Sequence, residues 1–241
     1  MDLLHTLPFI STVITLAFAG AVFYRFLKGR RWHTLAWSFG LLLYAAGTFS
    51  EAYLALAWSP FILRLWYLSG AMLTAAWLAQ GSVYLLVRKA RVAHGLALAL
   101  AVVSLAALGL VALAPLDAAG FQSGVAISTQ YKDLLTRTRP MVILTVLLNI
   151  YGTLGLVGGA AYSAWLFWRK HVLLNRMLGN ILIAVGGLFP AAAGTLIRVG
   201  LGDWLYISEL LGAAIMFVGF TLATQTQTAP KEQTAPAPAR A

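Results

Sequence analysis

The sequence lacks cysteine altogether and has few charged residues. Without cysteine the chain can form no disulfide, no thiolate metal site and no cysteine nucleophile. Charged residues make up 10% of the 241 residues, whereas soluble domains carry about 25%. Too little polar surface therefore remains to cover a water-soluble core. Because 61% of the residues are hydrophobic, the composition predicts a protein embedded in a membrane.

Acidic residues are scarcer than basic ones, seven against seventeen, and the formal net charge is +10. The basic residues lie at the ends of apolar segments, which is the placement of topology signals in membrane proteins, so we expect no nucleic-acid binding. The four histidines have no metal-ligand spacing, and no Ser/His/Asp arrangement or phosphate-binding glycine loop stands out. We therefore expect no metal and no cofactor, and nothing in the sequence calls for an enzyme.

Seven apolar segments are long enough to cross a membrane. A helix needs about 20 apolar residues to span the hydrocarbon core, and in lipid the backbone must satisfy its own hydrogen bonds. The sequence therefore predicts an all-α bundle of seven transmembrane helices within residues 1–224. The first is interpreted as an uncleaved helix, because its basic residues follow the apolar stretch. The expected spans are 4–25, 34–58, 61–87, 92–114, 141–167, 173–198 and 204–224.

The basic residues also predict the orientation of the bundle. Twelve of the seventeen fall in the first, third and fifth connections and the tail: Arg25, Lys28, Arg30, Arg31, Arg88, Lys89, Arg91, Arg169, Lys170, Arg176, Lys231 and Arg240. Loops rich in Lys and Arg stay in the cytoplasm, so the N-terminus is expected outside and the C-terminus inside a plasma or inner membrane. The tail, residues 225–241, is rich in Pro, Ala, Thr and Gln and is expected to be disordered in the cytoplasm.

The sequence also predicts an internal repeat, in which a unit of three helices occurs twice. Parallel membrane repeats of this kind place a shared cavity between the two halves. The predicted parts are residues 4–87 for repeat one, 92–114 for a linking helix, 115–140 for an external loop and 141–224 for repeat two. Aligned pairs include Leu42 with Leu182, Gly47 with Gly187, Phe49 with Phe189 and, after a slip of two residues, Gly70 with Gly212. The external loop is expected to be either a strap that links the repeats or a lid over an outward cavity.

Ionisable side chains inside a span cost about 2.5–3.5 kcal/mol on insertion scales, so each one needs a reason. Four of them are expected at one level of the outer leaflet, namely Glu51, Arg64, Arg198 and Glu209. In one interpretation, Glu51–Arg64 and Glu209–Arg198 are ion pairs that join neighbouring helices. In the other, the four residues line a polar vestibule for a solute or lipid headgroup, with one carboxyl group able to take up a proton. Because Glu51 and Glu209 are not equivalent in the two repeats, the vestibule is favoured.

Neutral polar residues are expected deeper in the bundle. Gln80, Asn149, Tyr151 and Asn180 can bridge helices by hydrogen bonds. Asn149 and Asn180 are also candidates for lining a solute pathway. Pro190 lies within the sixth span and is predicted to kink it, because proline removes one backbone hydrogen bond. We therefore predict a hinge at this residue.

The predicted orientation and the 3+1+3 repeat resemble, in architecture alone, the broad group of SWEET and PQ-loop sugar carriers, opsins and seven-helix receptors. The resemblance covers residues 4–224 and implies a central cavity open to the outside. The chain departs from these families at their motifs. It contains no Pro-Gln pair, and its seventh segment (Trp204 to Ala223) has no lysine to hold retinal.

Two functions remain open at this stage. The first, which is the leading hypothesis, is a small-solute carrier or permease that rocks one repeat against the other around an outward-facing polar vestibule. The second is a non-catalytic sensor or accessory membrane subunit that binds a lipid, a hydrophobic ligand or a partner protein. The scarcity of polar groups near the membrane midplane is the observation that favours this alternative over the carrier.

Overall fold

Helices make up nearly all of the computed structural model, in which residues 3–170, 173–198 and 204–225 are described. Within these ranges the only β-structure is an isolated bridge between Leu116 and Leu135, so the predicted all-α class is confirmed. In chain order the helical segments are α1 (Leu3–Gly29), α2 (Trp32–Leu54), α3 (Pro60–Trp66), η1 (Tyr67–Leu73), α4 (Thr74–Leu86), α5 (Ala90–Leu113), α6 (Ile127–Leu134), α7 (Arg139–Thr153), η2 (Leu154–Gly158), α8 (Gly159–Arg169), α9 (Leu174–Arg198) and α10 (Trp204–Thr224).

Six helical stretches of the described chain are long and apolar enough to cross a membrane. Several of these segments in one chain are what a membrane-embedded protein requires, because a span needs about 20 apolar residues. They are Thr6–Gly29, Pro60–Leu86, Ala90–Leu113, Arg139–Arg169, Leu174–Ala192 and Trp204–Thr224.

Helix α2 is the predicted span that does not belong to these six. It has 23 residues but carries several polar side chains, and most of these are buried: Thr34, Ser38, Thr48, Ser50 and Glu51. Three of them bond to carbonyl oxygens one turn earlier in their own helix: Ser38 to Thr34, Thr48 to Tyr44 and Ser50 to Ala46. The protein interior therefore accommodates this polarity, and a seventh span at α2 stays a prediction.

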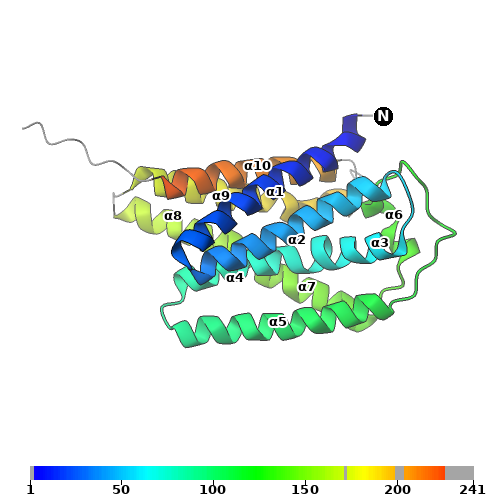
Figure 1. The fold of residues 1–241 in the computed structure, drawn as a ribbon, viewed down its shortest axis with the longest axis horizontal. Helices are drawn as coiled ribbons and strands as arrows, with labels where there is room; N and C mark the ends of the chain where they lie inside the picture. The colour runs from blue at the N-terminus through cyan, green and yellow to red at the C-terminus, as the bar shows by residue number, and fades with distance from the viewer. Residues whose placement is uncertain (1–2, 171–172, 199–203, 226–241) are drawn as a thin grey trace, which may run out of the picture.

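The long helices lie side by side, and different segments of the chain lie at the two ends of the bundle (Figure 1). At one end, here called the α6 end, are the start of α1, helix α6 and the long connection that contains it. At the other end, the basic end, the chain turns between α1 and α2 and between α4 and α5, α8 ends and α9 begins. The turns and adjoining helix ends there carry Arg25, Lys28, Arg30, Arg31, Arg88, Lys89, Arg91, Arg169, Lys170 and Arg176.

The helices pack in two groups that meet in the middle. Helix α2 packs against α1 and α4, whereas α9 packs against α8 and α10. The groups join where α1 meets α10 and where α4 meets α7 and η2. Helix α5 lies at the edge of the bundle, against α4, η1 and α7. Its outward side chains are strongly exposed, as at Leu98 and Leu113, which suits a helix that faces lipid.

Glycines allow two helix pairs to approach closely at their crossings. A Cβ atom built on Gly47 of α2 would lie 3.0 Å from the Cα of Gly70 in η1. One built on Gly212 of α10 would lie 2.8 Å from the carbonyl oxygen of Gly186 and 2.9 Å from Cδ of Pro190, both in α9. Small residues are the usual means by which helices approach in membranes. A side chain at either crossing would therefore push the helices apart.

The third and fifth long helices each contain a π-helical stretch, η1 and η2. A π-helical turn is wider than an α-helical turn and changes which carbonyl groups are paired within the helix. Side chains bond to two carbonyl oxygens of η1: Thr74 donates to Ser69 at 2.8 Å, and Asn149 of α7 donates to Ala71 at 2.8 Å. The polar side chains thus hold η1 in place and tie the two helices together.

Candidate functional site

Glu51 and Glu209 come together from helices far apart in the sequence. Helix α2 presents Tyr44, Thr48 and Glu51 on one face, because these residues are spaced by four and then three positions. The hydroxyl of Tyr44 donates to the backbone carbonyl of Glu209 in α10 at 2.8 Å. Thr48 is 3.0 Å from the hydroxyl of Thr12 in α1. These bonds hold α2 against α1 and α10 and bring the two carboxyl groups within hydrogen-bond reach of each other.

Glu51 is buried and Glu209 is half-buried, and each has a buried carboxyl oxygen. Glu51 is 2% exposed, and its Oε1 accepts a hydrogen bond from the indole N–H of Trp66 at 2.9 Å. Oε2 of Glu51 and Oε2 of Glu209 are both buried, and no described residue donates a hydrogen bond to either. A buried charged group without partners is costly. The arrangement thus concentrates two acidic groups where the described side chains provide little to stabilise two negative charges.

The structure does not bring Arg64 to Glu51. The guanidinium of Arg64 instead donates to the carbonyl oxygens of Val111 and Ala114, at 3.2 and 3.1 Å. These carbonyls end α5, where a helix leaves its last oxygens without intrahelical partners. Arg64 therefore anchors α5 to α3. The backbone of Arg198 is the last described position of α9, and its side chain lies outside the described residues.

The connection between α5 and α7 packs closely over the α6 end. Ile127, Leu134 and Leu135 are almost completely buried, whereas Lys132 and Asp133 of α6 are exposed. The connection thus contains a short helix, α6, with one buried apolar face. The ring of Tyr131 packs against Trp66, with 5.2 Å between ring centroids. Trp66 also donates a hydrogen bond to Glu51. A single side chain, that of Trp66, therefore lies between the connection and the carboxyl pair.

The predicted polar residues of the interior divide between helix bridging and other roles. Gln80 is fully buried and links three helices: its Nε2 donates to the carbonyl of Ala93 in α5 at 3.0 Å, and its Oε1 accepts from Tyr151 of α7 at 2.7 Å. Asn149 bridges α7 to η1. Asn180 donates to the carbonyl of Arg176 in its own helix and lines a small cavity. Helix α9 continues through Pro190, and the predicted hinge there stays a prediction.

We expect Tyr151→Phe to lower the free energy of unfolding by roughly 0.6–2 kcal/mol, because it leaves Gln80 without its donor in the bundle interior. Tyr162→Phe is the matched control, since Tyr162 is 50% exposed on α8. Reversible unfolding in mixed micelles measures both changes. Equal effects of the two substitutions would show that the buried hydrogen bond contributes no stability.

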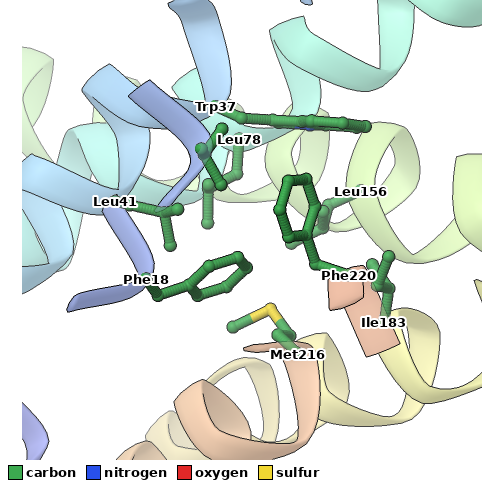
Figure 2. A pocket seen from close by; sticks show the side chains of 9 residues that line it. Phe18, Trp37, Leu41, Leu78, Leu156, Ile183, Met216 and Phe220 are labelled. Carbon is green, nitrogen blue, oxygen red and sulfur yellow. The ribbon is translucent and has the colours of Figure 1, made fainter. Parts of the chain in front are cut away.

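A small apolar cavity lies where the two helix groups meet (Figure 2). Its volume is about 30 Å³, room for one or two small groups. Figure 2 shows the rings of Phe18 and Phe220 and the side chain of Met216 around the cavity, with Trp37 closing one side. The lining residues come from helices of both groups and from η2: Phe18, Val22, Trp37, Leu41, Leu78, Leu156, Ile183, Met216 and Phe220.

This cavity lies in the half of the bundle near the basic end. The guanidinium of Arg25 stacks on the ring of Phe220, one of the lining residues, at 5.2 Å. A second cavity of about 20 Å³ shares Trp37 and Ile183 with the first. Its other lining residues include Ser82, Ser163 and Asn180. The two neighbouring cavities are thus apolar near the centre and partly polar towards the basic end.

The sequence did not point to all of these residues. The role of Tyr44 could have been found from its spacing to Glu51, which places both on one helix face. The cavity had no comparable signal, because its lining residues are apolar like most of the chain. In the described residues, no three His, Asp or Glu side chains group in a way that could hold a metal ion.

No family model matches the chain, and neither curated proteins nor solved structures show a significant match. Chemistry and geometry must therefore carry the functional argument.

Proposed function

We propose that this protein is a non-catalytic multi-pass membrane protein that binds the hydrocarbon part of a lipid or another apolar molecule between two three-helix units. The observation that carries the proposal is the apolar cavity lined from both helix groups. Ligand sites are concave and mostly apolar, with few polar groups. The cavity fits the end of an apolar chain, and the unbranched side chain of Met216 can shift to admit more of it.

The packing of the helices supports a repeat with a shared interface. Two-fold symmetry would make the contact of the first and seventh helices equivalent to that of the fifth and third. The bundle has both contacts, α1 with α10 and α7/η2 with α4. The crossing at Gly47 and Gly70 is matched by one at Gly186 and Gly212, within one residue of the sequence alignment. We infer that α2 also crosses the membrane, which brings the number of spans to seven. We further infer that the basic end faces the cytoplasm, as Lys and Arg in short loops require.

Binding of an apolar molecule accounts for the polar groups better than passage of a polar solute. Gln80, Tyr151 and Asn149 use their hydrogen bonds to join helices, so they are not free to replace the water around a solute. Arg64 is occupied by the end of α5. A polar vestibule formed by Glu51, Arg64, Arg198 and Glu209 would need Arg64 to leave those carbonyls.

Leu156→Phe tests the proposal by filling the cavity. Leu156 is 7% exposed and lines the cavity, whereas Leu154 of the same η2 segment is 69% exposed. We expect Leu156→Phe to weaken binding of a pyrene-labelled fatty acid by about tenfold or more, which corresponds to about 1.4 kcal/mol. Leu154→Phe is expected to bind as the wild type does. The measurement is probe fluorescence with purified protein in detergent micelles.

Melting temperatures of both variants control for misfolding. Binding that is equally tight in the two variants would show that the cavity is not the site. Retention of lipids by the purified wild-type protein, read by mass spectrometry and lost in Leu156→Phe, would support the same site independently.

A carrier is the second candidate function. It is favoured by the second cavity, whose partly polar lining continues from the first towards the basic end. Uptake of a sugar-like or charged solute into proteoliposomes, abolished by Glu51→Gln, would support this function. Such a result, with no binding of the fatty-acid probe, would replace the proposal above.

A further inference from the structure

We propose that Glu51 and Glu209 form a proton-binding site, in which one proton held between the two carboxyl groups joins α2 to α10. This inference concerns the α6-end half of the bundle and is independent of the apolar cavity. Its chemistry is that of an acid–carboxylate pair, in which one carboxyl group donates to the other.

The geometry of the pair requires something positive between the carboxyl groups. They lie within hydrogen-bond reach of each other, yet an ionised carboxylate can only accept hydrogen bonds. Oε2 of each residue is buried without a donor from the rest of the described protein. Two negative charges this close in a medium of low dielectric constant repel strongly, so adjacent buried carboxyl groups keep a proton between them. A single shared proton satisfies both residues.

Among the described side chains, none near the pair supplies a cation that would replace the proton. Arg64 on α3 is bound to the end of α5, and α1 has no charged side chain between Thr6 and Tyr24. Lys132 and Asp133 of α6 are exposed. The other described titratable side chains at this end of the neighbouring elements are phenols: Tyr44 and Tyr53 on α2, Tyr67 on η1, Tyr131 on α6 and Tyr206 on α10. The side chain of His5 in α1 lies outside the described residues. Two cations remain as candidates, Arg198 of α9 and His5 of α1, and the experiment addresses both.

Other contacts hold the pair in position. Trp66 donates to Oε1 of Glu51, which leaves its second oxygen for Glu209. Tyr44 of α2 donates to the backbone carbonyl of Glu209, which fixes the height of α10 against α2. Because α2 belongs to one helix group and α10 to the other, the shared proton bridges the groups. Its release would place two adjacent negative charges across their junction and push α2 from α10.

The test compares stability against pH in the wild type, Glu51→Gln and Glu209→Gln. The folded wild type binds one proton that the unfolded chain releases, so its stability falls as pH rises. A one-proton difference changes the unfolding equilibrium constant by about tenfold per pH unit. In each single variant a glutamine amide donates in place of the proton. We expect both variants to lack this part of the pH dependence, as measured by unfolding in mixed micelles between pH 6 and 9, a range of about three units.

Three results would overturn the inference. Parallel pH profiles in the wild type and both single variants would show that no proton is shared. A wild type stabilised by sodium relative to choline at constant pH would identify a metal cation between the carboxylates. Loss of the wild-type pH dependence in Arg198→Gln or in His5→Gln would instead assign the pair to that cation. The Glu51→Gln/Glu209→Gln variant provides the background from other titrating groups. Because none of these measurements involves the fatty-acid probe, their failure is distinct from failure of the proposed function.

Discussion

Gly212→Leu is expected to lower the free energy of unfolding by about 3 kcal/mol, the upper end of the usual cost of overpacking. Its Cβ alone would lie 2.8 Å from the carbonyl oxygen of Gly186 and 2.9 Å from Cδ of Pro190. The first neighbour is backbone and the second is a rigid ring, so neither can turn aside. Helices α9 and α10 would have to separate. Within the group formed by α8, α9 and α10, these two helices share the most extensive packing.

Gly109→Leu is the matched control for this substitution. Gly109 lies on α5, and an added Cβ there would have no neighbour within 4 Å. Both substitutions give the same gain in helix propensity, so their difference isolates the packing of α9 on α10. We expect Gly109→Leu to leave stability unchanged or to raise it by up to about 1 kcal/mol, because only helix propensity changes. Thermal unfolding of both variants in detergent provides the measurement, and a Gly212→Leu variant as stable as Gly109→Leu would contradict the close crossing.

Arg64→Met is expected to cost about 3 kcal/mol as well, for an electrostatic reason. Hydrogen bonds from a charged group contribute about 1.5–3 kcal/mol each, and Arg64 donates two to the end of α5, at Val111 and Ala114. The methionine keeps much of the apolar stem but donates nothing. Because α5 packs on the edge of the bundle, its C-terminal turn should open. Hydrogen exchange of the amides of residues 108–114 should therefore quicken before the rest of the bundle responds.

Arg137→Met separates this anchoring role from the general loss of a positive charge near the α6 end. Arg137 stacks on the ring of Tyr131 at 5.1 Å, a contact worth about 0.5–1 kcal/mol at an exposed site. We expect its replacement to leave exchange in α5 unchanged. If Arg64→Met and Arg137→Met have equal effects, Arg64 does not anchor α5.

The membrane class followed from the sequence because composition and segment length are local properties. Six of the predicted spans appear as helices that are long and apolar enough to cross a membrane. Helix α2 shows where such reasoning weakens. Hydropathy counts Thr48, Ser50 and Glu51 as unfavourable in lipid, but α2 buries them against protein or bonds them to its own backbone. The composition of a helix does not determine which neighbouring helix each of its faces packs against.

In the candidate site, too, the sequence predicts local properties of each residue but not its packing partners. The sequence indicated that Glu51, Arg64 and Glu209 lie at a similar depth, since depth depends only on distance along each helix. Their partners depend on how each helix is rotated and what it packs against. Rotation turned Arg64 towards the carbonyls of α5 and left Glu51 facing Trp66 and Glu209.

The sequence by itself determined that this chain is an apolar, all-helical membrane protein with its basic residues gathered between particular helices. Hydrophobic length and charge placement are enough for that, because lipid permits few alternatives. Tertiary structure alone decided that two carboxyl groups meet and that apolar side chains from both helix groups leave a cavity between them. Both features arise at the junction of helices distant in the chain, where close packing rather than composition selects the neighbours.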